Sequence, residues 1–205
     1  MNDAKIHGLF PTPIYMSNIN RKFTHNELIF IHEQKKYCKK NAGNINTEDN
    51  YILKRSELND IKTFLQKSCN EYLKKVICPK NDIELYITQS WLNYTEKGQF
   101  HHSHTHPNSY VSGVLYINCD SKYDKILFLN SKEYKQIRPE VKKYNIWNSP
   151  TWWFSVGSGD LVMFPSSTTH QVETKQGDNL RISLAFNTFV KGKIGLPNAL
   201  TELIL

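Results

Sequence analysis

The segment GQFHHSHTHP, residues 98–107, holds four of the eight histidines in the chain. Imidazole nitrogens bind iron, zinc, nickel and copper, so this tract is a candidate metal site. If the tract is extended, successive side chains point to opposite faces. His102, His104 and His106 then share one face. His101 points the other way. Two histidines at positions i and i+2 can hold a metal ion from one side, and a third ligand must come from elsewhere in the fold.

One distant histidine lies in a segment that could supply this third ligand. His170 stands in GDLVMFPSSTTHQVE, within a region of predicted strands. The other three, His7, His25 and His32, lie in the N-terminal part of the chain, and we interpret them as surface or packing residues. A pair of histidines on one strand and a third on another match the facial arrangement of non-haem iron sites, which leaves coordination positions open.

A basic residue follows His170 on the next predicted strand. Arg181 and Ser183 share one face of that strand, while Ile182 and Leu184 face the other way. A guanidinium that points into a β core is costly unless it meets an anion. Its fork of donors, with a hydroxyl beside it, suits a carboxylate. A structural ion pair with a buried Asp or Glu is the alternative. Together with the histidines, this pattern predicts iron chelated by a small keto acid whose far carboxylate meets Arg181.

The N-terminal part of the chain carries the predicted helices. Residues 24–40 begin with a capping box, and residues 56–77 have an amphipathic stripe of apolar side chains. Two prolines exclude a helix from residues 8–19 but allow an edge strand. Residues 41–50 form a predicted polar loop.

From residue 83 onward the pattern changes to short strands. These segments are rich in β-branched and aromatic residues, and turn residues separate most of them. Several strands at short spacing, with no helix between them, indicate a sandwich or an open barrel. The predicted strand segments are IELYITQSWLNYTEKG, with a turn at its end, YVSGVLYINC, KILFL, TWWFSVGSGDLVMFP, HQVETKQGD and LRISLAFNTFV.

Composition and charge limit the class of protein. The chain has 205 residues, of which 39% are hydrophobic and 12% aromatic, as in a globular domain. Its net charge of +7 raises the question of nucleic acid, but the basic residues form no stripe interleaved with aromatic residues, so nucleic acid is a minor candidate partner. The four cysteines form no CxxC pair. No signal peptide and no apolar run of the ~18 residues that span a membrane is visible, so we expect a cytoplasmic protein without a membrane partner.

The chain resembles the 2-oxoglutarate/Fe(II)-dependent oxygenases. More narrowly, it is similar to a family of 2OG-Fe(II) oxygenases with bacterial and marine phage members. The order and spacing of the matching pieces make the resemblance specific, and residues 20–80 contribute least to it. The matching pieces are LFPTPIY, SWLNY, HTHPNSYVSGVLYI, GDLVMFPSSTTHQV, RISLAFNTF and LTELIL.

This resemblance implies a fold and a set of cofactors. The fold is mainly β with N-terminal helices and a double-stranded β-helix core of the jelly-roll, cupin-like type. We expect one oxygenase domain over residues 1–205, with a helical N-terminal layer at 1–80, the β-helix core at 83–190 and a tail at 191–205. Fe(II) is the implied metal, and 2-oxoglutarate and O2 are the implied cosubstrates. A phage-encoded member would act in the host cytoplasm.

Position by position, the resemblance places His104, His106 and His170 on the iron ligands. Pro107 ends the extended segment, which puts His106 at the mouth of the barrel and makes His102 a neighbour of the metal site. Most of the superfamily has Asp or Glu at the position of His106. Three neutral imidazoles leave the metal one unit more positive, which favours an anionic chelator and makes zinc, nickel or copper easier to bind.

The resemblance also assigns the 2-oxoglutarate site. Arg181 falls on the residue that pairs with the distal carboxylate, and Ser183 supports it. Asn93 and Tyr94 lie on the strand that commonly contacts 2-oxoglutarate, and the sequence leaves open which of the two does so. Several aromatic residues are candidates for the pocket wall, although each is more often core: Trp91, Tyr110, Tyr116, Trp152 and Trp153.

The implied reaction is hydroxylation of an unidentified substrate, with succinate and CO2 as co-products. Two alternatives remain open at this level. One is a three-His, cupin-like metal dioxygenase that binds its substrate directly, with Arg181 on the substrate's own carboxylate. The other is a non-enzymatic β-barrel binding module that contains a metal. The sequence does not specify the primary substrate or the oligomeric state.

Overall fold

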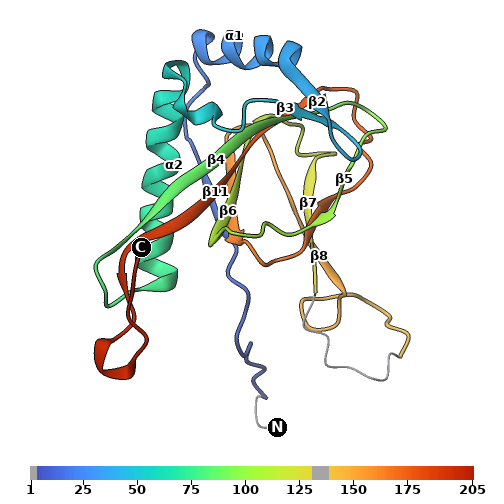
Figure 1. Cartoon of the computed structure of the whole chain (residues 1–205). Helices are drawn as coiled ribbons and strands as arrows, with labels where there is room; N and C mark the ends of the chain where they lie inside the picture. Colours follow the sequence, from blue (N-terminus) through green and yellow to red (C-terminus); the bar gives the residue numbers. More distant parts are fainter. Residues whose placement is uncertain (1–3, 131–138) are drawn as a thin grey trace.

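Two antiparallel sheets and a few helices make up the fold (Figure 1). The structure, a computed structural model, describes residues 4–130 and 139–205. The mainly β fold expected from the sequence is confirmed. In these residues the larger sheet has the strand order β1 (Tyr15–Asn18), β9 (Asp160–Pro165), β6 (Val111–Asn118), β11 (Arg181–Ile194), β4 (Ile83–Thr95), β3 (Ile45–Thr47) and β2 (Cys38–Lys40), and β12 (Leu203–Ile204) pairs with β11. The smaller sheet has the order β5 (His101–His104), β10 (His170–Val172), β7 (Lys125–Leu129) and β8 (Thr151–Ser155).

The chain moves back and forth between the two sheets. From β4 to β11, every connection between described strands changes sheet except the one from β7 to β8. Each strand segment predicted beyond residue 83 overlaps at least one of these strands, and β11 runs four residues beyond its predicted segment. This alternation brings β5 and β10 together in the smaller sheet although about 65 residues separate them along the chain, and β10 pairs with both β5 and β7.

Two helices cover the outer face of the larger sheet: α1 (His25–Gln34) and α2 (Asn59–Tyr72). Helix α1 starts at a capping box in which the Thr24 hydroxyl accepts a hydrogen bond from the Glu27 N–H at 3.2 Å and the Glu27 carboxylate accepts one from the Thr24 N–H at 2.7 Å. A five-residue π-helical segment, Leu73–Ile77, continues α2. Short 3-10 turns lie at Lys35–Tyr37, Ile52–Lys54, Ser56–Leu58 and Pro197–Ala199.

The structure corrects two expectations in the N-terminal region. The predicted helix 24–40 ends at Gln34, because residues 38–40 become β2 and pair with β3. The predicted polar loop 41–50 contains β3, which pairs with β4 through Ile45 and Asn46. The N-terminal region therefore contributes β1, β2 and β3 to the larger sheet in addition to its helices.

The larger sheet is buried on both faces. On its outer face, apolar side chains of β4, β6 and β11 pack against α1 and α2, and Leu92, Leu184 and Phe186 are fully buried there. On its inner face, a second cluster between the sheets includes Tyr116 and Phe164. This double burial explains why the strand segments are almost continuously apolar.

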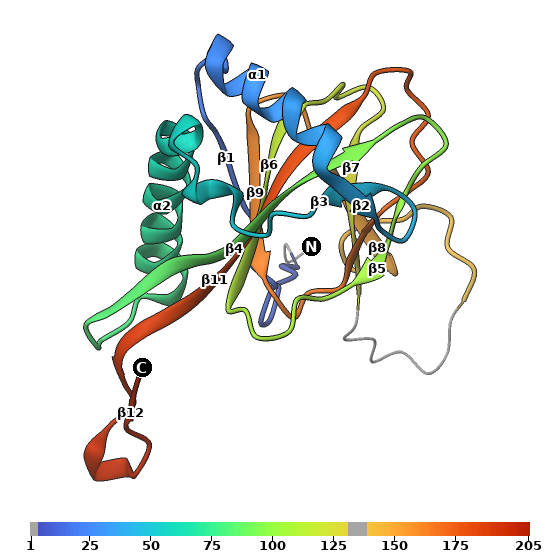
Figure 2. The same ribbon diagram turned by 45° about the horizontal axis from the view of Figure 1, so that its top comes forward.

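The chain ends in a hairpin that extends away from the two sheets (Figure 2). β12 pairs with the end of β11, and several exposed apolar residues follow the turn, among them Leu200 and Ile204. Among the described helices, none combines the length and the apolar character that a membrane crossing requires.

Candidate active site

Three imidazoles from two separate chain segments meet between β5 and β10. His104 at the end of β5 is the register partner of His170 at the start of β10, and His106 follows in the connection after β5. Their ring centroids lie 4.3 Å apart for His104 and His170, 4.9 Å for His104 and His106, and 5.1 Å for His106 and His170. One nitrogen from each ring lies within 4.8 Å of the others, close enough for small ring rotations to place all three around one metal ion.

Backbone carbonyls fix the tautomers of two of these rings. His104 Nδ1 lies 2.8 Å from the His102 carbonyl oxygen, and His170 Nδ1 lies 3.1 Å from the Thr168 carbonyl oxygen. A carbonyl oxygen only accepts, so each Nδ1 carries the proton and each Nε2 keeps its lone pair. Such outer hydrogen bonds orient metal-binding histidines in proteins, and here they leave Nε2 as the nitrogen with an available lone pair.

His106 is held by the ends of neighbouring strands. Its backbone N–H donates to the Ser166 carbonyl just after β9, at 3.0 Å. The Ser166 hydroxyl donates in turn to Ser109 at 2.7 Å and pairs with Ser112 at 2.8 Å, so a buried hydroxyl cluster ties the His106 connection to β6 and β9.

Burial keeps these imidazoles in the form that binds metal. Removal from water lowers the pKa of His170 to about 3 and that of His106 to about 4, and it lowers the pKa of His104 as well. All three are therefore neutral at pH 7, and metal binding requires neutral imidazole.

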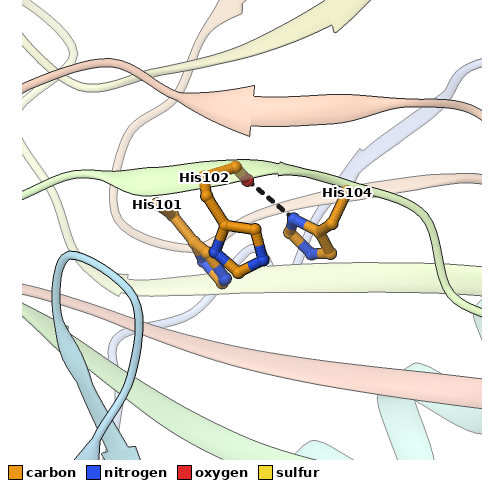
Figure 3. Close-up of side chains that lie close together, drawn as sticks. All are labelled: His101, His102 and His104. Carbon is orange, nitrogen blue, oxygen red and sulfur yellow. Dashed lines mark hydrogen bonds between the residues drawn. The ribbon is translucent and has the colours of Figure 1, made fainter.

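The structure contradicts the prediction that His101 points away from the site. Its ring stacks on that of His104, with centroids 4.6 Å apart and planes 20° apart, and it lines the cavity beside His104, His106 and His170. The cause is an irregular register between β5 and β10. His170 pairs with His104 and Val172 pairs with His101, so a step of two residues along β10 corresponds to a step of three along β5. The extra residue breaks the two-residue alternation, and His101 turns to the same side as His104 (Figure 3).

Arg181 lies where the strand pattern predicts, on the inner face of β11. It is 3% exposed. Its Nη2 donates to Thr95 Oγ1 at a long 3.4 Å, and its Nη1 lies 4.0 Å from the Asp124 carboxylate. Its Nε finds no partner among the described residues. The guanidinium is thus under-bonded, a costly state for a buried charge unless an anion joins it.

Arg181 forms only a weak ion pair with a buried carboxylate, so the alternative of a purely structural ion pair has little support. Asp124 is the buried carboxylate near Arg181, at the limiting distance for an ion pair. A second buried cation, Lys175, binds the Gly177 carbonyl and Asn179, and Asn179 approaches Asp124 at 3.4 Å. Two buried cations against one buried carboxylate leave an excess positive charge, which a carboxylate ligand can neutralise.

Ser183 and Asn93 lie beside Arg181, whereas Tyr94 does not. Ser183 on β11 is the register partner of Asn93 on β4, and both line the cavity. Tyr94 points to the opposite face of the sheet, where its hydroxyl donates to the Ile31 carbonyl of α1 at 2.5 Å. Of the two candidates on this strand, Asn93 is therefore the one that faces the site, and Tyr94 belongs to the helix side.

The sequence did not predict a polar residue that lies beside Asn93. Asn46 on β3 is the register partner of Asn93, and the side-chain oxygens of both are buried with no hydrogen-bond partner among the described residues. An amide side chain can rotate to present its NH2 group, so this pair offers hydrogen bonds to a ligand. The segment NIN around Asn46 has the composition of a loop, and no sequence pattern marks it as part of the site.

A cavity of about 40 Å³ joins the histidines to Arg181. Among the aromatic candidates, Trp91 and Tyr116 form part of its wall, while Tyr110, Trp152 and Trp153 are exposed elsewhere. The volume holds only about three water molecules, so a five-carbon diacid requires wall side chains to rotate.

Comparison with known proteins identifies relatives by fold. No curated protein matches the chain. The solved structures that match include an oxidoreductase of the 2OG-Fe(II) oxygenase family from Burkholderia pseudomallei, with 14% identity and a TM-score of 0.58 over 85% of this chain and 83% of that one. A prolyl hydroxylase from Trichoplax adhaerens, in complex with a hypoxia inducible factor peptide, has 14% identity and a TM-score of 0.58 over 86% and 83% of the two chains. HygX from Streptomyces hygroscopicus, with nickel, 2-oxoglutarate and hygromycin B bound, has 11% identity and a TM-score of 0.56 over 86% and 82%.

A family model covers the part of the chain that carries the site. The model described as “Putative 2OG-Fe(II) oxygenase” matches residues 89–187, which include the three clustered histidines, Arg181, Ser183 and Asn93. At identities this low, the solved structures support the fold, and the family model adds the match in sequence. Residues 89–187 therefore match the family of 2OG-Fe(II) oxygenases, oxidoreductases that use Fe(II) and 2-oxoglutarate, and the fold is similar to that of a solved oxidoreductase of this family.

Proposed function

We propose that the chain is a dioxygenase that hydroxylates an as yet unidentified substrate and releases succinate and CO2. One observation carries the proposal: three neutral imidazoles and an under-bonded buried guanidinium line the same small cavity. The first group suits a divalent transition metal, and the second suits a carboxylate at a distance from it.

The proposal extends to the architecture. The alternation of β4 to β11 between two sheets supports a double-stranded β-helix, or jelly roll, in the single domain expected over residues 1–205. In such a core the site lies between the sheets, where inward side chains of both converge. The helical layer would then stiffen the outer face of the larger sheet, away from the reaction.

In this proposal His104, His106 and His170 hold Fe(II) through neutral imidazole nitrogens. The hydrogen bonds from His104 Nδ1 and His170 Nδ1 to backbone carbonyls favour this role, because they leave Nε2 free in both rings. A set of three neutral ligands leaves the full charge of the metal uncompensated. This charge favours the anionic cosubstrate and gives the protein little selectivity against zinc, nickel or copper.

Arg181 binds the distal carboxylate of 2-oxoglutarate in the proposed complex. Its unpaired Nε and its long contact to Thr95 leave donors available. Ser183 adds a hydroxyl, and Asn93 adds an amide on the opposite strand. Trp91 and Tyr116 exclude water from this part of the cavity. When bound, iron and 2-oxoglutarate supply the oxidative chemistry: decarboxylation of the keto acid coupled to insertion of oxygen into the substrate.

The decisive experiment measures conversion of 2-oxoglutarate to succinate by the metal-free chain reloaded with Fe(II) in the presence of O2. Even without its substrate, an enzyme of this type is expected to turn over 2-oxoglutarate slowly. Arg181→Ala should lower kcat/KM for 2-oxoglutarate by roughly 100-fold, since a desolvated charge pair is lost. Arg55→Ala is the matched control, because Arg55 is exposed and pairs with Asp49 on the surface.

Two outcomes contradict the proposal. If the Fe(II)-loaded chain never forms succinate but consumes O2 with a carboxylate substrate in an Arg181-dependent way, the cupin-like dioxygenase without 2-oxoglutarate is correct. If metal raises stability and no 2-oxoglutarate binds, the non-enzymatic binding module is correct. Isothermal titration with 2-oxoglutarate under anaerobic conditions separates the proposal from both cases, and O2 consumption with carboxylate substrates separates the two cases from each other.

A further inference from the structure

A second cluster of three histidines lies next to the proposed iron site. The rings of His101, His102 and His104 come together on one side of β5 (Figure 3), with centroids 4.6 to 5.2 Å apart. One nitrogen from each ring lies within 4.8 Å of the others, the same closeness as in the cluster of His104, His106 and His170. The irregular pairing of β5 causes this, because it turns His101 to the side of His104.

We propose that His101, His102 and His104 form a second metal-binding position, which cannot be occupied at the same time as the iron site. The two positions share His104. A neutral imidazole has one nitrogen with a lone pair, and in His104 this is Nε2, because Nδ1–H is bonded to the His102 carbonyl. His104 therefore serves one metal ion or the other.

The second position lies closer to solvent than the first. His102 is exposed and His101 is half-buried, whereas His170 in the proposed iron site is 5% exposed. The Nε2 of His101 accepts only a long hydrogen bond, 3.3 Å, from the Asn41 amide. A metal ion that arrives from solvent thus meets His102 first and displaces one weak contact to reach His101.

The chemistry of the ligands selects the metal. Three neutral imidazoles without a carboxylate bind Zn²⁺ and Cu²⁺ more tightly than Fe²⁺, following the Irving–Williams order. We therefore expect Zn²⁺ or Cu²⁺ in the second position, with an inhibitory effect: it withdraws His104 from the iron and holds His101 at the wall of the cavity that leads to Arg181. The inhibitory effect rests on the proposed function, but the binding of metal does not.

The test measures Zn²⁺ binding by isothermal titration to the full-length, metal-free chain. The variant His106→Gln/His170→Gln removes two ligands of the proposed iron site and keeps the second cluster whole. It should bind one equivalent of Zn²⁺. Adding His102→Gln should weaken that binding at least about tenfold. Adding His32→Gln instead, an exposed histidine of α1, should leave it unchanged.

Zn²⁺ binding by the wild-type chain tests whether the two metal positions exclude one another. It should bind one Zn²⁺ and not two, because both positions need His104. Two tight equivalents would overturn the shared use of His104. The second position itself is overturned if the double variant binds no Zn²⁺, or if His102→Gln has no effect on its binding.

Two further measurements check that the variants fold and that Zn²⁺ binds at the proposed position. Circular dichroism of the metal-free variants checks folding, and if the double variant does not fold, the single variant His170→Gln is titrated in its place with the same expected dependence on His102. A zinc-edge anomalous map of the variant crystal should place the ion among His101, His102 and His104. Absence of succinate formation by the Fe(II)-loaded wild-type chain, with intact Zn²⁺ binding in the double variant, would count against the proposed function alone.

Discussion

His104 and His170 face each other as register partners across β5 and β10, with ring centroids 4.3 Å apart. Each Nδ1–H donates to a carbonyl two residues earlier in its own chain segment. Two residues far apart in sequence thus receive matching orientations from the backbone alone. In the proposed metal site, hydrogen bonds of this kind would hold both rings in the orientation that binding requires.

Replacing His170 with Gln should lower Fe(II) affinity at least roughly 100-fold, because the remaining pair holds the ion from one side only. Anaerobic equilibrium binding measures this change. His25→Gln, an exposed substitution at the start of α1, should leave the affinity unaltered. Equal Fe(II) affinity in His170→Gln and the wild type would remove His170 from the ligand set.

Asp124→Asn should lower KM for 2-oxoglutarate by roughly threefold to tenfold. The Asp124 carboxylate competes with an incoming carboxylate for Arg181, and at 4.0 Å it contributes little to holding the guanidinium in place. The same change should lower the free energy of unfolding, because a buried cation loses its countercharge. Steady-state kinetics with Asp178→Asn, an exposed control, checks the prediction. A higher KM would mean that Asp124 positions Arg181 instead.

Asn93 and Tyr94 are adjacent, and they should respond differently to substitution. Asn93→Ala should raise KM for 2-oxoglutarate roughly tenfold, since a buried hydrogen-bonding group of the cavity is lost. Tyr94→Phe should leave KM within about twofold and lower the free energy of unfolding by about 1–2 kcal/mol, because it removes the bond to the Ile31 carbonyl. Kinetics and urea denaturation of both variants test the assignment, and the reverse pattern would exchange their roles.

The metal-free protein should lose stability as the pH falls below about 6.5. His101, His104, His106 and His170 have folded-state pKa values lowered by burial, to about 3 or 4 where the shift is largest. Between these values and the ordinary histidine pKa of about 6.5, the unfolded chain binds more protons than the folded one, so stability rises with pH in this window. Each group contributes up to about 1.4 kcal/mol per pH unit.

Urea denaturation of the metal-free chain at several values between pH 8 and pH 4.5 measures this dependence. The free energy of unfolding should be level above pH 7 and fall below pH 6.5. The variant His170→Gln should show a shallower fall, because it lacks one of the titrating imidazoles. A flat profile down to pH 4.5 would contradict the burial of these rings as neutral groups.

Strand alternation predicted the inner face of β11 but not that of β5. β11 pairs on both sides with β4 and β6, and in its first half Arg181 and Ser183 face inward as the pattern requires. β5 has four residues and an irregular register, so the orientation of His101 depends on how β10 pairs with it. A local sequence pattern carries no information about such long-range pairing.

Asn46 illustrates the same limit in the N-terminal region. Its three-residue strand has no hydrophobic alternation, and its place beside Asn93 comes only from pairing with β4. The early end of α1 has a related cause, because residues 38–40 pair with β3 instead of extending the helix. The capping box, a signal confined to four residues, placed the start of the helix correctly.

The two faces of β11 also bear on how the chain reaches its native state. Ile182 and Leu184 pack toward the helices, while Arg181 and Ser183 face the cavity. A shift of one residue in the pairing would exchange these sets, burying a guanidinium among apolar side chains and opening the cavity to isoleucine. A chain with β11 in the wrong register is therefore expected to be less stable than the native fold, and this difference in stability favours the native register.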